Sequence, residues 1–274
     1  MTTRAFVAGW PISHSKSPKL HGFWLDRYGI DGTYEPLALR EKEFPEFLRE
    51  LKSSGFAGGN VTIPHKEMAF ELVDKPDEDA SAIGAVNTLW FENGKLCGGN
   101  TDAYGFSANL DHRAPRWREG KNAVILGAGG AARSILYALK QARFETIHIA
   151  NRTHERAKNL AEEFGAPCIA HSLDDFSRLL PDADLLINTS AIGMKDVDTG
   201  MRFDFSVLHS KAIVTDIVYT PINTPFLCTA SAAGLETVDG LGMLMHQAVP
   251  GFEKWFGQRP EVTNELREYI LERL

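Results

Sequence analysis

Apolar and polar positions along this chain follow two spacings, one typical of buried strands and one typical of helices, and both occur within residues 122–139. The apolar run 124–126 is typical of a buried parallel strand. The next apolar positions recur at helical spacing: Ala132, Ile135, Leu136 and Leu139. Because the spacing changes at Gly127, the pattern predicts a strand, a glycine turn and a helix.

The same two spacings predict the other elements of the chain. Strands are predicted at 4–9, 33–39, 85–90, 95–98, 144–150, within 184–194, at 212–219 and at 236–238. Helices are predicted near 17–28, 43–51 and 157–164, after 104, after Thr224-Pro225, and beyond 240, where Pro250 is expected to kink or end the first helix. Asn93-Gly94 predicts a two-residue hairpin turn.

Strands that alternate with helices predict an α/β fold, here with two domains. We expect an N-terminal α/β domain with a mixed sheet, formed by residues 1–103 and completed by C-terminal helices in 241–274. A Rossmann-type domain, residues 104–240, is expected to be inserted between these two parts.

The glycine turn has the pattern G-x-G-x-x-A. Gly127 allows the tight turn, Gly129 allows a pyrophosphate to approach the backbone, and Ala132 lets the helix pack on the sheet. An ordinary strand-to-helix turn would look similar. The strand at 144–150 closes a βαβ unit of the expected ~30 residues, which favours a dinucleotide site.

The residues after that second strand indicate which dinucleotide binds. NAD sites usually have an acidic residue there, whereas this chain has Asn151-Arg152-Thr153. Arg152 can bind a 2′-phosphate by paired hydrogen bonds, so NADP is preferred over NAD. Two plainer interpretations stay open: Arg152 and Arg156 are solvated residues at a helix start, and Thr153 caps that helix.

Polar residues also gather where other predicted strands end. Ser17-Pro18 is a helix-start pattern with Ser17 as N-cap, which leaves Ser13 and Ser15 as further hydroxyls for a carboxylate or a polyol. Asn60, Thr62 and Lys66 form a second group, although a single lysine is usually a surface residue. Asp102 precedes a helix and would be its N-cap if no lysine paired with it.

Composition excludes several classes of partner. The chain has 274 residues, 43% of them hydrophobic and 24% charged, and a net charge of −7, which argues against nucleic acid and anionic membranes. The sequence shows no long apolar run and no signal-peptide pattern, so we expect a cytoplasmic protein. The cysteines Cys97, Cys168 and Cys228 lack metal-ligand spacing and are expected to be buried.

Taken together, a series of motifs closely resembles the shikimate dehydrogenase family over essentially the whole chain. They are Ser13-x-Ser-x-Ser-Pro-x-x-His21, Asn60-Val-Thr-Ile-Pro-His-Lys66, Gly84-Ala-Val-Asn-Thr88, Asn100-Thr-Asp102, the glycine turn, Asn151-Arg-Thr153 and Asp239-Gly-Leu-Gly-Met243. The resemblance implies a two-domain α/β enzyme that interconverts 3-dehydroshikimate and shikimate with NADP(H) in aromatic amino-acid biosynthesis, without a metal. One departure is Ala191, where proline is more usual in the family.

The resemblance also implies roles for individual residues. The catalytic pair is Lys66 and Asp102. The substrate contacts are Ser15 and Ser17 for the carboxylate, with Thr62, Lys66, Asn87, Asp102, Tyr219 and Gln247. The NADP contacts are Gly127, Ala128, Gly129, Gly130, Ala131, Asn151, Arg152, Thr153, Arg156, Gly240, Gly242 and Met243.

Two rival functions remain at this point. One is a quinate/shikimate dehydrogenase paralogue, against which the absence of an acidic residue at 151–153 argues. The other is a non-catalytic nucleotide-binding sensor, which would not need both Lys66 and Asp102. The oligomeric state is left open, with a homodimer as one outcome.

Overall fold

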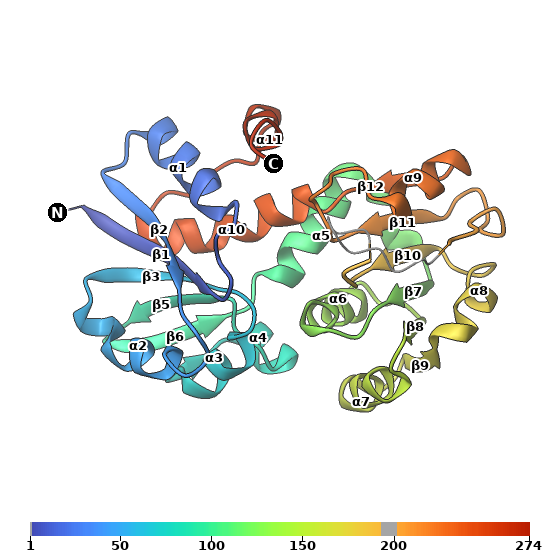
Figure 1. Cartoon of the computed structure of the whole chain (residues 1–274), viewed down its shortest axis with the longest axis horizontal. Coiled ribbons are helices and arrows are strands. Elements are labelled where there is room, and N and C mark those ends of the chain that lie inside the picture. The colour runs from blue at the N-terminus through green and yellow to red at the C-terminus, as the bar shows by residue number, and fades with distance from the viewer. Residues whose placement is uncertain (1, 193–201) are drawn as a thin grey trace. The chain divides into compact units, whose positions relative to one another are not determined.

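The computed structural model describes residues 2–192 and 202–274, and the chain divides into two compact units (Figure 1). The first unit is formed by Met1–Gly105 with Leu244–Leu274, and the second by Phe106–Met243. The sequence predicts the domain borders between residues 103 and 104 and between residues 240 and 241. The predicted class, an α/β chain with one mixed and one parallel sheet, is confirmed.

The first unit contains most of the N-terminal elements. They are β1 (Thr3–Gly9), α1 (Ser17–Tyr28), β2 (Gly32–Ala38), α2 (Phe44–Glu50), the 3₁₀ turn η1 (Leu51–Ser53), β3 (Phe56–Val61), α3 (Lys66–Leu72), β4 (Lys75–Pro76), α4 (Glu78–Ile83), β5 (Thr88–Glu92) and β6 (Lys95–Gly99). Helix α5 (Asp102–Arg113) begins here, and the chain ends in α10 (Leu241–Phe256) and α11 (Asn264–Leu271).

The sheet of the first unit has the strand order β2-β1-β3-β5-β6-β4. Strand β1 runs parallel to both neighbours, whereas β5 is antiparallel to β3 and to β6. Asn93 and Gly94 join β5 to β6 with φ of 51° and 77°, which is the type I′ turn that the sequence predicts.

Helices cover both faces of this sheet. Alternate residues of β1 point to opposite faces: Phe6 and Ala8 pack with α2, α3 and α4, and Ala5 and Val7 pack with Trp255 of α10. Gly59 of β3 lies so close to Phe6 that a Cβ there would be 2.5 Å from the phenyl ring. Glycine therefore lets the two strands pack tightly at the centre of the unit.

The second unit continues the chain. Its elements are the 3₁₀ turn η2 (Pro115–Glu119), β7 (Asn122–Leu126), α6 (Gly130–Gln141), β8 (Thr146–Asn151), α7 (His154–Phe164), β9 (Cys168–Ser172), the 3₁₀ turn η3 (Leu173–Asp175), α8 (Phe176–Leu179), β10 (Leu185–Asn188), β11 (Ile213–Asp216), α9 (Pro225–Ala232) and β12 (Glu236–Val238).

All strand pairs of the second sheet are parallel, in the order β12-β11-β10-β7-β8-β9. Residues 123–126 of β7 are at most 2% exposed, so both faces of this strand are covered. That explains why its sequence is a continuous apolar run rather than an alternating one. Helices α8 and α9 cover one face, and α7 packs on β8 and β9.

Two helix predictions were wrong in detail. Ser17 is the first residue of α1 rather than its N-cap; Lys16 has the N-cap position and makes no side-chain cap bond. Pro250 lies inside α10 and does not end it, whereas the alternative that it kinks the helix stays a prediction. Buried neighbours of Pro250, including Met245, Val249 and Phe252, hold the helix in place, so packing outweighs the lost backbone hydrogen bond.

The edge of the second sheet and the cysteines also differ from expectation. Strand β9 was not predicted, because its residues are only partly buried and show no apolar period. Cys97 is buried as expected, Cys168 is partly buried and Cys228 is exposed, so the prediction for Cys228 was wrong.

Residues 2–192 and 202–274 contain no helix that is long and apolar enough to cross a bilayer. The same residues contain no group of three or more His, Cys, Asp or Glu side chains arranged to hold a metal ion.

Candidate active site

Lys66 and Asp102 are joined by an ion pair in the first unit. Each is the first residue of a helix, α3 for Lys66 and α5 for Asp102. Lys66 Nζ lies 2.6 Å from Asp102 Oδ2, and the side chains are only 22% and 11% exposed. Partial burial strengthens this attraction relative to a pair in open water.

Asn87 orients the carboxylate of this pair. Its Nδ2 donates to Asp102 Oδ1 over 2.8 Å, while its Oδ1 accepts from the backbone N–H of Thr101, also over 2.8 Å. Asp102 is the first residue of α5 rather than its N-cap, and its backbone N–H donates to Asn100 Oδ1. Asn100 therefore takes the turn-forming role and leaves both Asp102 oxygens for Lys66 and Asn87.

Hydroxyl groups lie beyond the ends of β1 and β3, which are neighbouring parallel strands. Ser15 and Ser17 follow β1, and the Ser17 backbone N–H donates to Ser15 Oγ over 3.3 Å. Thr62 follows β3, and its backbone N–H donates to the backbone oxygen of Ala8 of β1 over 2.9 Å. The carboxyl ends of the two strands therefore bring the serine loop and Thr62 to one edge of the sheet, as ligand-binding α/β sheets commonly do.

Gln247 belongs to the first unit as part of α10. It is 9% exposed, and its side-chain amide donates to the backbone oxygen of Leu244 over 3.0 Å. The predicted contact between Gln247 and the substrate stays a prediction, because this hydrogen bond holds the side chain along its own helix.

The glycine turn joins β7 to α6 in the second unit. Gly127 has φ of 113°, and a Cβ there would lie 2.8 Å from Thr189 Oγ1, so the turn itself requires this glycine. A Cβ at Gly129 or Gly130 would meet no atom within 4 Å. The protein therefore leaves room over the start of α6, where backbone N–H groups suit a phosphate. These residues fit a dinucleotide.

Asn151 links the glycine turn to the end of β8. Its Oδ1 accepts from the backbone N–H of Ala128 over 3.2 Å, and its Nδ2 donates to the backbone oxygen of Thr153 over 2.9 Å. Thr153 has the N-cap position of α7 but makes no side-chain cap bond. Arg152 and Arg156 are exposed beside it. Their positive charge suits a 2′-phosphate.

The remaining predicted cofactor and substrate residues are packed within the second unit. A Cβ at Gly240 would lie 2.3 Å from the Ile217 oxygen, and one at Gly242 would lie 1.7 Å from Asn109 Oδ1. Packing within the unit thus already requires both glycines. Burial raises the pKa of Tyr219. Contacts of Gly240, Gly242, Met243 and Tyr219 with ligands stay predictions.

Two buried polar networks were missed from the sequence. In the second unit, Asp216 accepts from Asn188 Nδ2 over 3.0 Å and from the Thr224 hydroxyl over 2.7 Å. Burial raises the pKa of Asp216 to about 6. In the first unit, Tyr34 donates to Asn60, Asn60 donates to Thr88, and Thr88 donates to Asn87. The sequence signal that could have identified these residues is a polar residue within an otherwise apolar strand or at its end.

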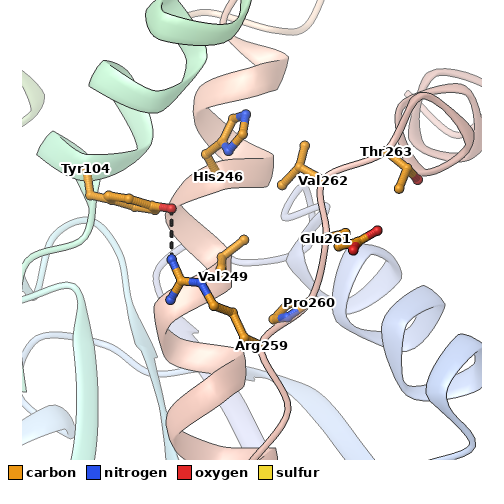
Figure 2. A pocket seen from close by; sticks show the side chains of 8 residues that line it. All are labelled: Tyr104, His246, Val249, Arg259, Pro260, Glu261, Val262 and Thr263. Carbon is orange, nitrogen blue, oxygen red and sulfur yellow. Dashed lines mark hydrogen bonds between the residues drawn. The ribbon is translucent and has the colours of Figure 1, made fainter.

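The first unit also has a groove of about 370 Å³ (Figure 2). Its lining residues are Tyr104, His246, Val249, Arg259, Pro260, Glu261, Val262 and Thr263. Arg259 donates to the Tyr104 hydroxyl over 3.1 Å and also pairs with Glu253. None of these lining residues was a predicted site residue, so the groove is separate from the predicted substrate contacts.

Comparison with known proteins shows similarity over the whole chain. Residues 7–89 match a family model described as the shikimate dehydrogenase substrate binding domain, and residues 111–217 match one described as shikimate / quinate 5-dehydrogenase. The shikimate dehydrogenase (NADP(+)) of Bartonella quintana (strain Toulouse) is 57% identical over 274 residues, which cover 98% of this chain and 93% of that protein.

Solved structures agree with the sequence relatives. Shikimate 5-dehydrogenase from Thermus thermophilus, in complex with NADP(H) and shikimate, has a TM-score of 0.88 at 35% identity, with 100% of both chains covered. Quinate dehydrogenase from Corynebacterium glutamicum, in complex with NAD, has a TM-score of 0.91 at 29% identity, with 99% of both chains covered. The matches in sequence and in fold agree, and the chain belongs to the shikimate dehydrogenase family.

Proposed function

We propose that the chain catalyses the reversible NADPH-dependent reduction of 3-dehydroshikimate to shikimate. The observation that carries this proposal is the partly buried Lys66–Asp102 pair, whose carboxylate is held by Asn87. The high identity to a named NADP-dependent shikimate dehydrogenase supports the substrate and the cofactor. A sensor without catalytic activity would have no use for this pair.

Lys66 has the chemistry that reduction of a ketone requires. When a carbonyl carbon gains a hydride, negative charge develops on the oxygen, and a cation that can also give up a proton stabilises it. Lys66 supplies the charge and the proton, and Asp102 holds the ammonium group in place. In the oxidation direction, the pair removes the hydroxyl proton.

The other substrate roles follow from where the hydroxyl and amide groups lie. Ser15 and Ser17 are proposed to bind the substrate carboxylate, which matches their place beside the first turn of α1. Thr62, Asn87 and Gln247 are proposed to bind the ring hydroxyls, and Tyr219 is a further proposed substrate contact. These hydrogen bonds would orient the carbonyl toward Lys66.

The cofactor is proposed to bind at the glycine turn of the second unit. When bound, NADPH supplies the hydride for the reduction. Residues 127–131 would hold the pyrophosphate at the start of α6, and Arg152 with Arg156 would bind the 2′-phosphate, while Asn151 keeps the glycine turn in place. A cytoplasmic location and a homodimer stay predictions of the proposal.

The experiment is an initial-rate assay of NADP(H) absorbance that crosses shikimate and quinate against NADP⁺ and NAD⁺. We expect strong turnover only with shikimate and NADP⁺. Comparable turnover of quinate or of NAD⁺ would favour dual specificity, a function suggested by the similarity to a quinate dehydrogenase that binds NAD. No turnover with any pair would refute catalysis by this chain.

A further inference from the structure

A buried chain of hydrogen bonds begins at Tyr34 in β2 and ends at the catalytic pair. The Tyr34 hydroxyl donates to Asn60 Oδ1 over 2.6 Å. Asn60 Nδ2 donates to the Asn87 backbone oxygen over 3.0 Å and to Thr88 Oγ1 over 3.1 Å. Tyr34, Asn60, Asn87 and Thr88 are all at most 8% exposed, so these bonds do not compete with bulk water.

This chain of hydrogen bonds has a direction, because each side-chain amide has a donor end and an acceptor end. The Asn87 backbone oxygen can only accept, so the Asn60 NH₂ must face it and Thr88, and Asn60 Oδ1 then faces the Tyr34 hydroxyl. Asn87 Oδ1 accepts from the backbone N–H of Thr101 over 2.8 Å and from the Thr88 hydroxyl over 2.9 Å, so the Asn87 NH₂ faces Asp102. A rotation of the Asn60 amide would place its oxygen against the Asn87 backbone oxygen, two acceptors that cannot pair, and leave buried groups without partners.

Tyr34 is held by its ring as well as by its hydroxyl. Its ring stacks on the imidazole of His21 with centroids 3.9 Å apart and an angle of 11° between the planes. Burial raises the pKa of Tyr34, while a hydrogen bond with Ser17 acts in the opposite direction. Burial also lowers the pKa of His21 to about 3, so both rings are neutral near pH 7. The phenol therefore keeps its proton for Asn60.

We propose that Tyr34 is a positioning residue: its hydroxyl holds the Asn60 side chain by bonding Asn60 Oδ1, and Asn60 in turn supports Thr88 and Asn87, which hold Asp102 where it orients Lys66. This inference rests on the proposed function and adds a residue that no sequence motif contained. Tyr34 is not proposed to touch the substrate carbonyl or the hydride of NADPH. It acts by keeping the Asn60 side chain in place beside Asn87, which keeps the proton-transfer geometry fixed.

The test is the Tyr34→Phe variant, which removes the hydroxyl and keeps the ring that stacks on His21. We expect kcat to fall about tenfold, because a hydrogen bond in a charged network is lost. The dissociation constant of NADPH should be unchanged. Because the Tyr34 hydroxyl also bonds Ser17, a proposed substrate ligand, the KM for shikimate is not a criterion, and the fall in kcat carries the test. The primary isotope effect measured with deuterated NADPH should rise, because slower chemistry limits turnover more fully.

Tyr28→Phe is the matched control in the same unit. The Tyr28 hydroxyl accepts from the backbone N–H of Glu261 and lies outside the buried chain. This control should keep wild-type kcat and a wild-type isotope effect. If Tyr34→Phe lowers only the melting temperature, with kcat per folded molecule and the isotope effect unchanged, the positioning role is refuted.

A double variant tests whether Tyr34 acts through Asn60. If it does, Tyr34→Phe combined with Asn60→Ala should lose little more kcat than Asn60→Ala alone. Fully additive losses would overturn the inference. Wild-type enzyme that does not oxidise shikimate would instead refute the proposed function, so the two failures are distinguishable.

Discussion

Replacing Thr224 with alanine removes one buried hydroxyl that makes two hydrogen bonds. Thr224 Oγ1 accepts from the backbone N–H of Leu227 at the start of α9 and donates to Asp216 Oδ2 over 2.7 Å. Loss of an N-cap costs about 1 kcal/mol, and loss of a hydrogen bond to a buried charge costs about 2 kcal/mol. We therefore expect a loss of about 3 kcal/mol when Asp216 is ionised.

The pH dependence of this loss follows from Asp216. Burial raises its pKa to about 6, so its stabilising contribution is present when it is protonated and is lost as the pH rises through 6. Without Thr224 the ionised form loses a donor, and the pKa rises further. The loss should therefore be larger near pH 8 than near pH 5, where the missing cap dominates.

Thermal unfolding followed by circular dichroism measures the effect. A loss of about 3 kcal/mol corresponds to a decrease of roughly 8 °C in Tm for a chain of this size. Thr224→Ser keeps the hydroxyl and should lose much less. Equal losses in the Ala and Ser variants, or an Ala loss that is the same at both pH values, would refute the reasoning.

Three further predictions concern catalysis and the cofactor. Lys66→Ala should lower kcat by orders of magnitude with little change in KM, because Lys66 stabilises mainly the transition state. The control variant Lys75→Ala removes an exposed ion pair and should leave the rates unchanged in the same assay. Arg152→Ala should weaken NADPH far more than NADH in fluorescence titrations; equal losses would show that Arg152 does not bind the 2′-phosphate. Gly130→Ala should weaken NADPH binding without lowering Tm, because the added Cβ meets only open space. Gly127→Ala should lower Tm, because alanine is strained at the positive φ of this position. A drop in Tm for both variants would contradict this contrast.

Most elements could be predicted because local signals determine them. The apolar run 124–126, the Asn93-Gly94 turn and the Thr224-Pro225 helix start all lie at the predicted places. Strand β9 lacked such a signal because it is a partly buried edge strand. Pro250 did not end its helix because the packing of buried residues around it, which the local pattern of residue types does not show, decides whether the helix continues.

The site could be predicted only in part. Lys66 and Asp102 were identified by family resemblance, and the structure joins them by an ion pair. Tyr34 could not be predicted, because a tyrosine in a strand usually contributes a ring to the core. Its contact with Asn60 spans 26 positions in the sequence and depends on which strands are neighbours.

The direction of the amide chain also constrains how the gene can change. A single-base mutation converts an asparagine codon to an aspartate codon, a change that barely alters side-chain volume. At Asn87 it would replace the donor that faces Asp102 with a second acceptor, and two carboxylate oxygens would meet in a buried place. A single-step Asn87→Asp change is therefore expected to disturb the carboxylate that pairs with Lys66.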